Sequence, residues 1–328
     1  MTEFAANTIA HAIASRHEWA SAPFAFFSDK SPPLTSEDHF AGARRVALRL
    51  VMAYRGKWRK GVRVLIVAPT GPDLLVSLAG CWLAGAMAAP VDISLPDEGF
   101  QQVLRQFHPE IMLIDERVDF DGSRTAMAKA AGCIAIEDIS SQSFWPDGDA
   151  AINVVPEDPA LVIFTSGSTG MPKGVVLSQA NLVIGARNVM AAKRLTSDDR
   201  ALCVLPLSHL NGLMTTYVTP LLSGGSVVYL QGLFSADLAL RLIDSYRCTW
   251  FSAVPTLYAA MMKPPVPKSH WSLSSLRFCR SASSSLLPSL RREFEAHYGI
   301  PVIETMGMTE TSAQIFSNPL PPKLRKDG

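Results

Sequence analysis

The stretch ALVIFTSGSTGMPKGV, residues 160–175, joins a run of apolar residues to a segment rich in glycine and hydroxyl side chains. The apolar run predicts a buried strand. The eleven residues after it contain three glycines, four hydroxyl side chains and one lysine. Glycine reaches backbone conformations that let several N–H groups converge on an anion, and the hydroxyl groups and Lys173 add further donors. The stretch therefore predicts a phosphate-binding loop at the end of a strand.

The same residues disfavour two other interpretations of this loop. A flexible linker would need neither Lys173 nor the conformationally restricted Pro172. A Walker-type phosphate loop requires the spacing G-x-x-x-x-G-K-[ST], whereas Gly170 lies three residues before Lys173 here. The chain therefore lacks the motif that defines P-loop kinases and ATPases.

Strand-like apolar runs alternate with helix-length segments along most of the chain. The runs fall at 62–68, 88–92, 111–115, 133–138, 160–164, 201–206, 226–230, 249–254, 276–282 and 301–304. Segments of helical periodicity, such as 178–195, separate most of them. This order is typical of βαβ units, so we predict an α/β fold with parallel sheets covered on both faces. A polar segment at 141–158 predicts subregions of about 1–158 and 159–328.

Composition narrows the class of protein. The chain has 328 residues, of which 48% are hydrophobic and 18% charged, so it can bury a large core. Its formal net charge is +1, which gives no bulk electrostatic argument for a nucleic-acid partner. Five cysteines without a C-x-x-C spacing favour a reducing compartment over disulfides or a structural zinc site. With no secretory signal at the amino terminus, we expect a cytoplasmic protein.

One uncharged segment, residues 74–91, is long enough to be considered as a membrane span. It contains Gly80, Gly85 and Pro90, and it lies between two strand-like runs. A helix packed between strands fits these features better, so we expect no membrane span.

The segment FTSGSTGMPKGV (164–175) resembles the phosphate loop of the adenylate-forming superfamily, which includes acyl- and aryl-CoA synthetases and the adenylation domains of peptide synthetases. ETMGMTETS (304–312) is similar to the YGMTE motif of that family. LPLSHLNGL (205–213), FSAVPTLY (251–258) and LRFCRSASSSL (276–286) resemble three further family segments. The resemblance covers about residues 35–328.

This resemblance implies the large N-terminal domain of an adenylate-forming enzyme, residues 1–328. The expected architecture is two mostly parallel sheets covered by helices, plus a smaller β subregion. A small C-terminal domain, which carries the family's catalytic lysine, is expected beyond residue 328 and absent from this chain.

The resemblance also assigns residues to sites. The residues implied in ATP phosphate binding are Thr165, Ser166, Gly167, Ser168, Thr169, Gly170 and Lys173. Those implied around the adenine are Ser281, Ala282, Ser283, Glu304, Thr305 and Met306. Those implied in the acyl pocket are His209, Asn211, Gly212, Gly307, Met308 and Ser312. The implied catalytic residues are Lys173, His209, Thr309 and Glu310, with Glu310 as the ligand of Mg²⁺.

Departures from the family pattern bear on the substrate. Met306 stands where the family usually has a tyrosine that stacks on the adenine. Segment 205–213 lacks the acid that amino-acid-activating members use, which disfavours an α-amino acid. Asn211 and Ala313 occupy positions where oxalate–CoA ligases carry histidines, so we expect a monocarboxylic acid.

The implied reaction is ATP-dependent activation of a small carboxylic acid as acyl-AMP, with release of pyrophosphate. Transfer to a thiol would follow, with CoA as the first expectation. The implied cofactors are ATP, Mg²⁺ and CoA, or the phosphopantetheine of an acyl carrier protein. Two alternatives stay open: a ligase that loads a carrier protein, and a non-catalytic module that binds a nucleotide or an adenylate. The oligomeric state is not predicted.

Overall fold

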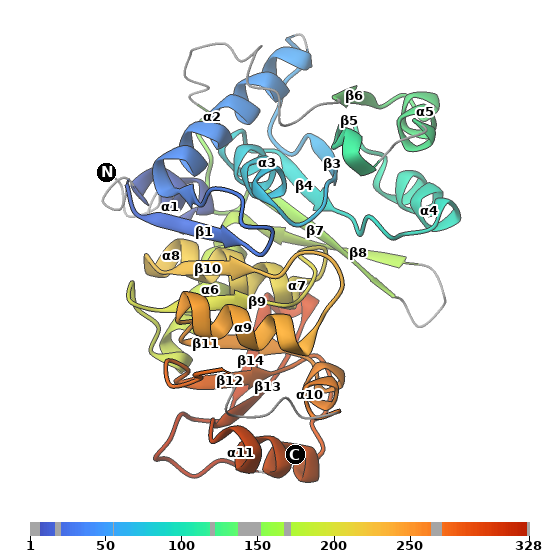
Figure 1. Cartoon of the computed structure of the whole chain (residues 1–328). Coiled ribbons are helices and arrows are strands. Elements are labelled where there is room, and N and C mark those ends of the chain that lie inside the picture. The colour runs from blue at the N-terminus through green and yellow to red at the C-terminus, as the bar shows by residue number, and fades with distance from the viewer. Residues whose placement is uncertain are drawn as a thin grey trace. The chain divides into compact units, whose positions relative to one another are not determined.

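The structure is a computed structural model of the chain, and it describes residues 7–16, 21–54, 56–118, 122–136, 152–166, 172–263 and 271–326. These residues form an α/β fold, as predicted, and the chain divides into two compact units (Figure 1). Unit 1 comprises residues 1–22 and 35–183, and unit 2 comprises residues 23–34 and 184–328. The sequence-based division near residue 158 stays a prediction.

The described part of unit 1 contains a six-stranded sheet of order β6-β5-β3-β4-β7-β8. All neighbouring pairs are parallel except β7 and β8, which form an antiparallel hairpin. Its elements are α1 (Ile9–Ala14), α2 (Ser36–Ala53), β3 (Arg63–Val67), α3 (Pro72–Leu83), β4 (Met87–Pro90), α4 (Asp97–Phe107), β5 (Ile111–Ile114), η3 (Glu116–Val118), α5 (Ser123–Ala130), β6 (Ile134–Ile136), β7 (Pro159–Ser166) and β8 (Pro172–Ser178).

Successive side chains of a strand point to opposite faces of its sheet, and this alternation builds two apolar layers in unit 1. Leu65 and Val67 of β3 pack with Phe100 and Leu104 of α4 on one face. Helix α3 contacts β3 and β4, and α1 and α2 pack against α3. The inner strands β3, β4 and β5 are buried on both faces, which explains their nearly continuous apolar sequence.

The uncharged segment 74–91 forms most of α3 and then β4, as the interpretation of a helix between strands predicted. Among the residues that the structure describes, no helix has the length and apolar character needed to cross a membrane.

The described part of unit 2 contains an eight-stranded sheet of order β14-β13-β12-β11-β9-β10-β1-β2. The pairs from β13 to β1 are parallel, and β14 is antiparallel to β13. Its elements are β1 (Pro23–Phe27), β2 (Leu34–Thr35), β9 (Arg200–Cys203), α7 (Leu210–Leu213), the π-helical turn η4 (Met214–Val218), α8 (Thr219–Ser223), β10 (Ser226–Tyr229), α9 (Ala236–Tyr246), β11 (Trp250–Ala253), α10 (Pro255–Met261), β12 (Phe278–Ser281), α11 (Pro288–Tyr298), β13 (Val302–Met308), η5 (Thr309–Thr311) and β14 (Ala313–Ser317). Helix α6 (Gln179–Lys193) begins in unit 1 and ends in unit 2.

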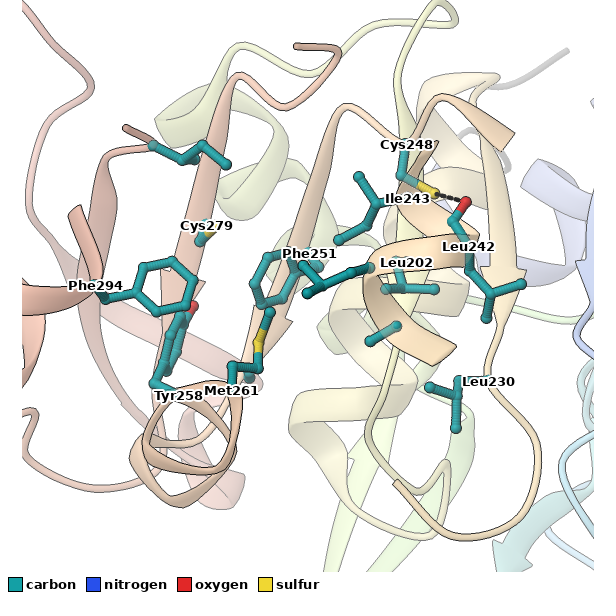
Figure 2. Close-up of a cluster of buried hydrophobic side chains, with 14 of the residues drawn as sticks. Leu202, Leu230, Leu242, Ile243, Cys248, Phe251, Tyr258, Met261, Cys279 and Phe294 are labelled. Carbon is teal, nitrogen blue, oxygen red and sulfur yellow. Dashed lines mark hydrogen bonds between the residues drawn. The ribbon is translucent and has the colours of Figure 1, made fainter. Parts of the chain in front are cut away.

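One face of this sheet carries the main apolar core of unit 2 (Figure 2). Phe251 of β11 and Cys279 of β12 meet Tyr258 of α10 and Phe294 of α11, with the rings of Tyr258 and Phe294 edge to face at 4.9 Å. Strand alternation places Ser252 and Arg280 on the opposite face. That second face carries the polar cluster described below.

The five cysteines are buried and free. Burial raises the pKa of the Cys248 thiol to about 12, so it is not a nucleophile near neutral pH.

Candidate functional site

The predicted phosphate loop lies at the tip of the β7–β8 hairpin. Thr165 on β7 pairs with Lys173 on β8, and the Thr165 hydroxyl donates to the Lys173 carbonyl oxygen at 3.4 Å. The Lys173 side chain is exposed. Ser166 ends β7, whereas Gly167, Ser168, Thr169 and Gly170 lie outside the described residues. The sequence predicted a loop over the whole stretch, but Pro172 to Ser178 form a strand because they pair with β7.

The residues predicted around the adenine lie at the carboxyl end of β12, in the turn that follows it, and in the middle of β13. The Thr305 hydroxyl donates to the carbonyl oxygen of Ser281 at 3.2 Å, which joins the two strands. The Glu304 carboxylate accepts a hydrogen bond from the Leu286 N–H at 3.1 Å. The Glu304 side chain thus holds the turn after β12 in place. The side chain of Met306 is 51% exposed. Ala282 is buried.

Residues 309–312 form a tight turn between β13 and β14, and Gly307 lies near the end of β13. A Cβ atom at Gly307 would lie 1.4 Å from the carbonyl oxygen of Ala313, so only glycine fits there. Thr309, Glu310 and Thr311 form the 3₁₀ helix η5, and Ser312 adopts a left-handed conformation with φ 56°. Thr309 is partly exposed and Glu310 is exposed, at the carboxyl end of a parallel strand.

His209 and Asn211 stand at the start of α7. His209 is exposed and occupies the N-cap position, where its carbonyl oxygen accepts the Leu213 N–H at 3.0 Å. The Asn211 amide donates to the Ser283 hydroxyl at 3.1 Å. This bond joins a residue of the predicted acyl pocket to one of the predicted adenine site. A Cβ atom added at Gly212 would lie 2.4 Å from the Pro206 carbonyl oxygen, so the backbone packs closely there.

A buried polar cluster, formed by Arg280, Ser252 and the partly buried Asn211, lies on the α7 face of the unit 2 sheet, and Asn211 connects it to the exposed Ser283. Arg280 donates through one terminal nitrogen to the Asn211 side-chain oxygen at 2.7 Å and to the Ser252 hydroxyl at 2.8 Å. Its side chain is only 2% exposed, and burial lowers the pKa of its guanidinium to about 10. No sequence-based expectation included Arg280 or Ser252. The sequence feature that could have pointed to Arg280 is an arginine inside the otherwise apolar run LRFCRSA.

Lys193 at the end of α6 is a second buried cation in unit 2. Its ammonium donates to the Ser317 hydroxyl at 2.5 Å and to the Asn318 carbonyl oxygen at 3.4 Å. Burial lowers the pKa of Lys193 to about 7, and the positive charge of Arg280 adds to that lowering. Arg280 is therefore close enough to disfavour the charged form of Lys193.

The donor set suits a nucleotide with a bound magnesium ion. Within the described ranges no group of three or more His, Cys, Asp or Glu side chains could hold a metal. Mg²⁺ usually takes only one or two protein carboxylates and completes its shell with waters and substrate phosphates. The exposed carboxylate of Glu310 fits that requirement, and Thr309 supplies a hydroxyl donor beside it.

Unit 1 contains a hollow of about 950 Å³. Arg63, His108 and Glu110 line it at the amino ends of β3 and β5. None of the predicted site residues contributes to it. Ligands of parallel α/β sheets bind at the carboxyl ends of the strands, so the turns after β12 and β13 are the better candidate.

The family of the chain follows from its sequence as a whole. The model of a family described as "AMP-binding enzyme" matches residues 17–328. The chain belongs to the AMP-binding enzyme family. The resemblance to adenylate-forming enzymes is thereby confirmed.

Curated relatives of this family member include named CoA ligases. A sulfoacetate–CoA ligase of Cupriavidus necator is 35% identical over 98% of this chain and 64% of its own length. An oxalate–CoA ligase of Arabidopsis thaliana is 30% identical over 80% of this chain and 53% of its own length. The chain thus spans about half to two thirds of the length of these relatives.

Solved structures agree with the fold. A crystal structure of ATP-bound MatB from Rhodopseudomonas palustris matches 96% of this chain and 62% of that chain, with a TM-score of 0.83 and 26% identity. An inhibitor-bound N-terminal domain of FACL13 from Mycobacterium tuberculosis matches 95% of this chain and 79% of that chain. Its TM-score is 0.84 at 20% identity, which shows the fold alone. The expected large N-terminal domain fold is confirmed.

Proposed function

We propose that this AMP-binding enzyme family member contributes the large domain of an acid–thiol ligase. The ligase activates a carboxylic acid with ATP and then forms a thioester with CoA. The observation that supports this most is the exposed turn Thr309–Glu310 at the carboxyl end of β13, in a chain that matches the family over residues 17–328. The named CoA ligases among the relatives support the same reaction class.

In the first step a carboxylate oxygen attacks the α-phosphorus of ATP. The bond from that phosphorus to the bridging oxygen breaks, which gives acyl-AMP and pyrophosphate. Thr309 would donate to an α-phosphate oxygen, and Lys173 with Thr165, Ser166, Gly167, Ser168, Thr169 and Gly170 would hold the β- and γ-phosphates. Such positioning and charge neutralisation supply most of the catalysis in phosphoryl chemistry. Mg²⁺ at Glu310 would neutralise phosphate charge when bound.

In the second step a thiol sulfur attacks the acyl carbon and AMP leaves. Ser281, Ala282, Ser283, Glu304, Thr305 and Met306 would border the adenine. His209, Asn211, Gly212, Gly307, Met308 and Ser312 would border the acyl group, and His209 is exposed enough to line a path for the thiol. CoA is the proposed acceptor, because the relatives are named CoA ligases. A carrier-protein phosphopantetheine is the alternative. Free, buried cysteines support a reducing, cytoplasmic location.

The class of acid has two candidates. The sequence predicted a monocarboxylic acid because no second cation was recognised near the pocket. Two relatives are named for acids with two anionic groups, sulfoacetate and oxalate, which favours an acid with a second anion.

ATP–pyrophosphate exchange tests the proposal. The protein that carries this chain is expected to exchange labelled pyrophosphate into ATP only when a suitable acid is present. Thr309→Ala and Lys173→Ala are each expected to lower exchange by about 100-fold, the typical loss for one donor to developing charge. Mass spectrometry of the products with CoA or a carrier protein identifies the acceptor.

A matched control removes an exposed lysine outside the predicted site. Lys323→Ala is expected to leave the exchange rate within about 2-fold, because its side chain is solvated. Exchange that is equally insensitive to Lys173→Ala and Thr309→Ala would contradict the assigned roles. ATP binding without exchange for any acid would favour a non-catalytic module.

A further inference from the structure

Arg280 is a buried cation without an anionic partner. Its side chain is 2% exposed in the middle of β12, and within the described residues no carboxylate forms an ion pair with it. Arg277, the residue just before β12, differs in both respects: its side chain is 39% exposed, and it pairs with the Asp199 carboxylate at 2.5 Å. Arginine in a protein interior is normally paired, since an isolated buried charge is strongly destabilising.

The neighbours of Arg280 orient it but do not neutralise it. Asn211 and Ser252 accept from one terminal nitrogen, at 2.7 and 2.8 Å. The buried Nε atom makes no hydrogen bond to any part of the chain that the structure describes. A guanidinium presents its donors in a planar fork that suits a carboxylate or sulfonate. Arg280 therefore retains donor capacity of the kind that such groups require.

A purely structural role explains these contacts less well. Hydrogen bonds to Asn211 and Ser252 need a donor, which a neutral side chain could provide without burying a charge. The uncompensated charge of Arg280 has a second cost, because it disfavours the charged form of Lys193. An anion beside Arg280 would reduce both penalties.

Asn211 connects this cation to the candidate site. Its side-chain oxygen accepts from Arg280, and its amide nitrogen donates to Ser283 at 3.1 Å. Asn211 belongs to the predicted acyl pocket and Ser283 to the predicted adenine site. Arg280 thus lies one hydrogen bond from Asn211 and two from Ser283, on the face of the sheet that carries α7.

We propose that Arg280 binds a second anionic group, a carboxylate or a sulfonate, on the acid that this site accepts. The substrate class is then a short acid with an anion at each end. This inference rests on the proposed function for the identity of the site. Ser252 and Asn211 act as positioning residues that hold the guanidinium.

The test compares acids that differ in the second anion. Malonate and sulfoacetate each carry one, and propanoate replaces the second carboxylate of malonate by a methyl group. In ATP–pyrophosphate exchange, the wild-type protein is expected to prefer the dianionic acids to propanoate by about 100-fold in kcat/KM, the size of a buried charge-assisted pair. The ratio between malonate and sulfoacetate distinguishes the two anions.

Arg280→Gln is expected to abolish this preference, mainly through a KM for the dianionic acid about 100-fold higher. Arg280→Lys keeps a cation and is expected to recover part of the preference. The matched control Ser252→Ala keeps the guanidinium and removes one acceptor, so its preference is expected to fall by less than about 10-fold. A structural role alone would instead change all three acids equally.

Calorimetric binding of the same acids to this chain, with its melting temperature as a check on folding, decides the inference without turnover. Tighter binding of malonate or sulfoacetate than propanoate, lost in folded Arg280→Gln, supports it. Equal binding of all acids by the wild-type chain, or a preference that survives Arg280→Gln, overturns it. If no acid supports exchange while binding still depends on Arg280, the inference stands and the proposed ligase activity fails.

Discussion

The β7–β8 hairpin of unit 1 and the buried polar cluster of unit 2 present cations in opposite ways. The Lys173 side chain is exposed, and its residue is held in place by the backbone pairing of β8 with β7. Arg280 is 2% exposed and is held by Asn211 and Ser252. Water solvates the first cation at little cost, whereas the second carries a desolvation penalty in the folded chain. The Lys173 side chain can therefore adjust to a ligand, whereas the Arg280 side chain is already held in position before a ligand binds.

The largest expected effect tests how tightly unit 2 is organised around its site. Gly307→Ala would place a Cβ 1.4 Å from the Ala313 carbonyl oxygen, a backbone atom that cannot move alone. We expect a loss of roughly 4 kcal/mol in the free energy of unfolding, measured by denaturant titration. Gly174→Ala in the hairpin is the control, because its nearest neighbour is a Val162 methyl at 3.1 Å. That variant is expected to lose less than about 1 kcal/mol, and equal losses would contradict the comparison.

The buried ammonium of unit 2 gives an alkaline test. The pKa of Lys193 is lowered to about 7 from 10.5 by burial and then by Arg280, so the unfolded chain binds more protons between these values. The free energy of unfolding must therefore rise with pH in this window, by about 2 kcal/mol from pH 7 to pH 9. Lys193→Met is expected to lack this rise. A variant with the same pH slope as the wild type would show that Lys193 does not titrate there.

Unit 1 gives the complementary acid test. His39 is buried, and burial followed by the charge of Arg16 lowers its pKa to about 3 from 6.5. The folded state keeps the neutral ring, so stability is lost as pH falls below 6.5, by about 2 kcal/mol at pH 5. His39→Gln is expected to remove this contribution in unfolding experiments at pH 7 and pH 5. Equal acid sensitivity of variant and wild type would assign the loss to other groups.

The smallest expected effect sharpens the contrast with Arg280. Lys173→Ala is expected to change the free energy of unfolding by less than about 0.5 kcal/mol, because the side chain is exposed. Thermal unfolding of the wild type and of Lys173→Ala measures this difference in stability. A substantial loss would mean that the ammonium supports the hairpin itself and is not held free for phosphate.

Local patterns in the sequence predicted much of the fold. Each of the ten predicted runs overlaps one strand among β3 to β7 or β9 to β13, because most of these strands are buried on both faces and need apolar residues. The edge strand β8 was predicted as loop, since its sequence PKGVVLS reads as the end of a glycine-rich segment. β1 and β14 were missed as well. β1 pairs with β10, about 200 residues away, and no local pattern encodes such a partner.

For the site, the sequence by itself identified the chemistry-bearing segments: the hydroxyl and glycine stretch with Lys173, and the turn with Thr309 and Glu310. Motif residues are contiguous, so they can be read without knowing the fold. The tertiary structure alone decided what Arg280 faces. Its partners Asn211 and Ser252 come from α7 and β11, and only the packing of these elements shows a buried cation without a carboxylate. Spacing in the chain fixes which groups are near in sequence, whereas burial and pairing across strands depend on contacts between distant segments.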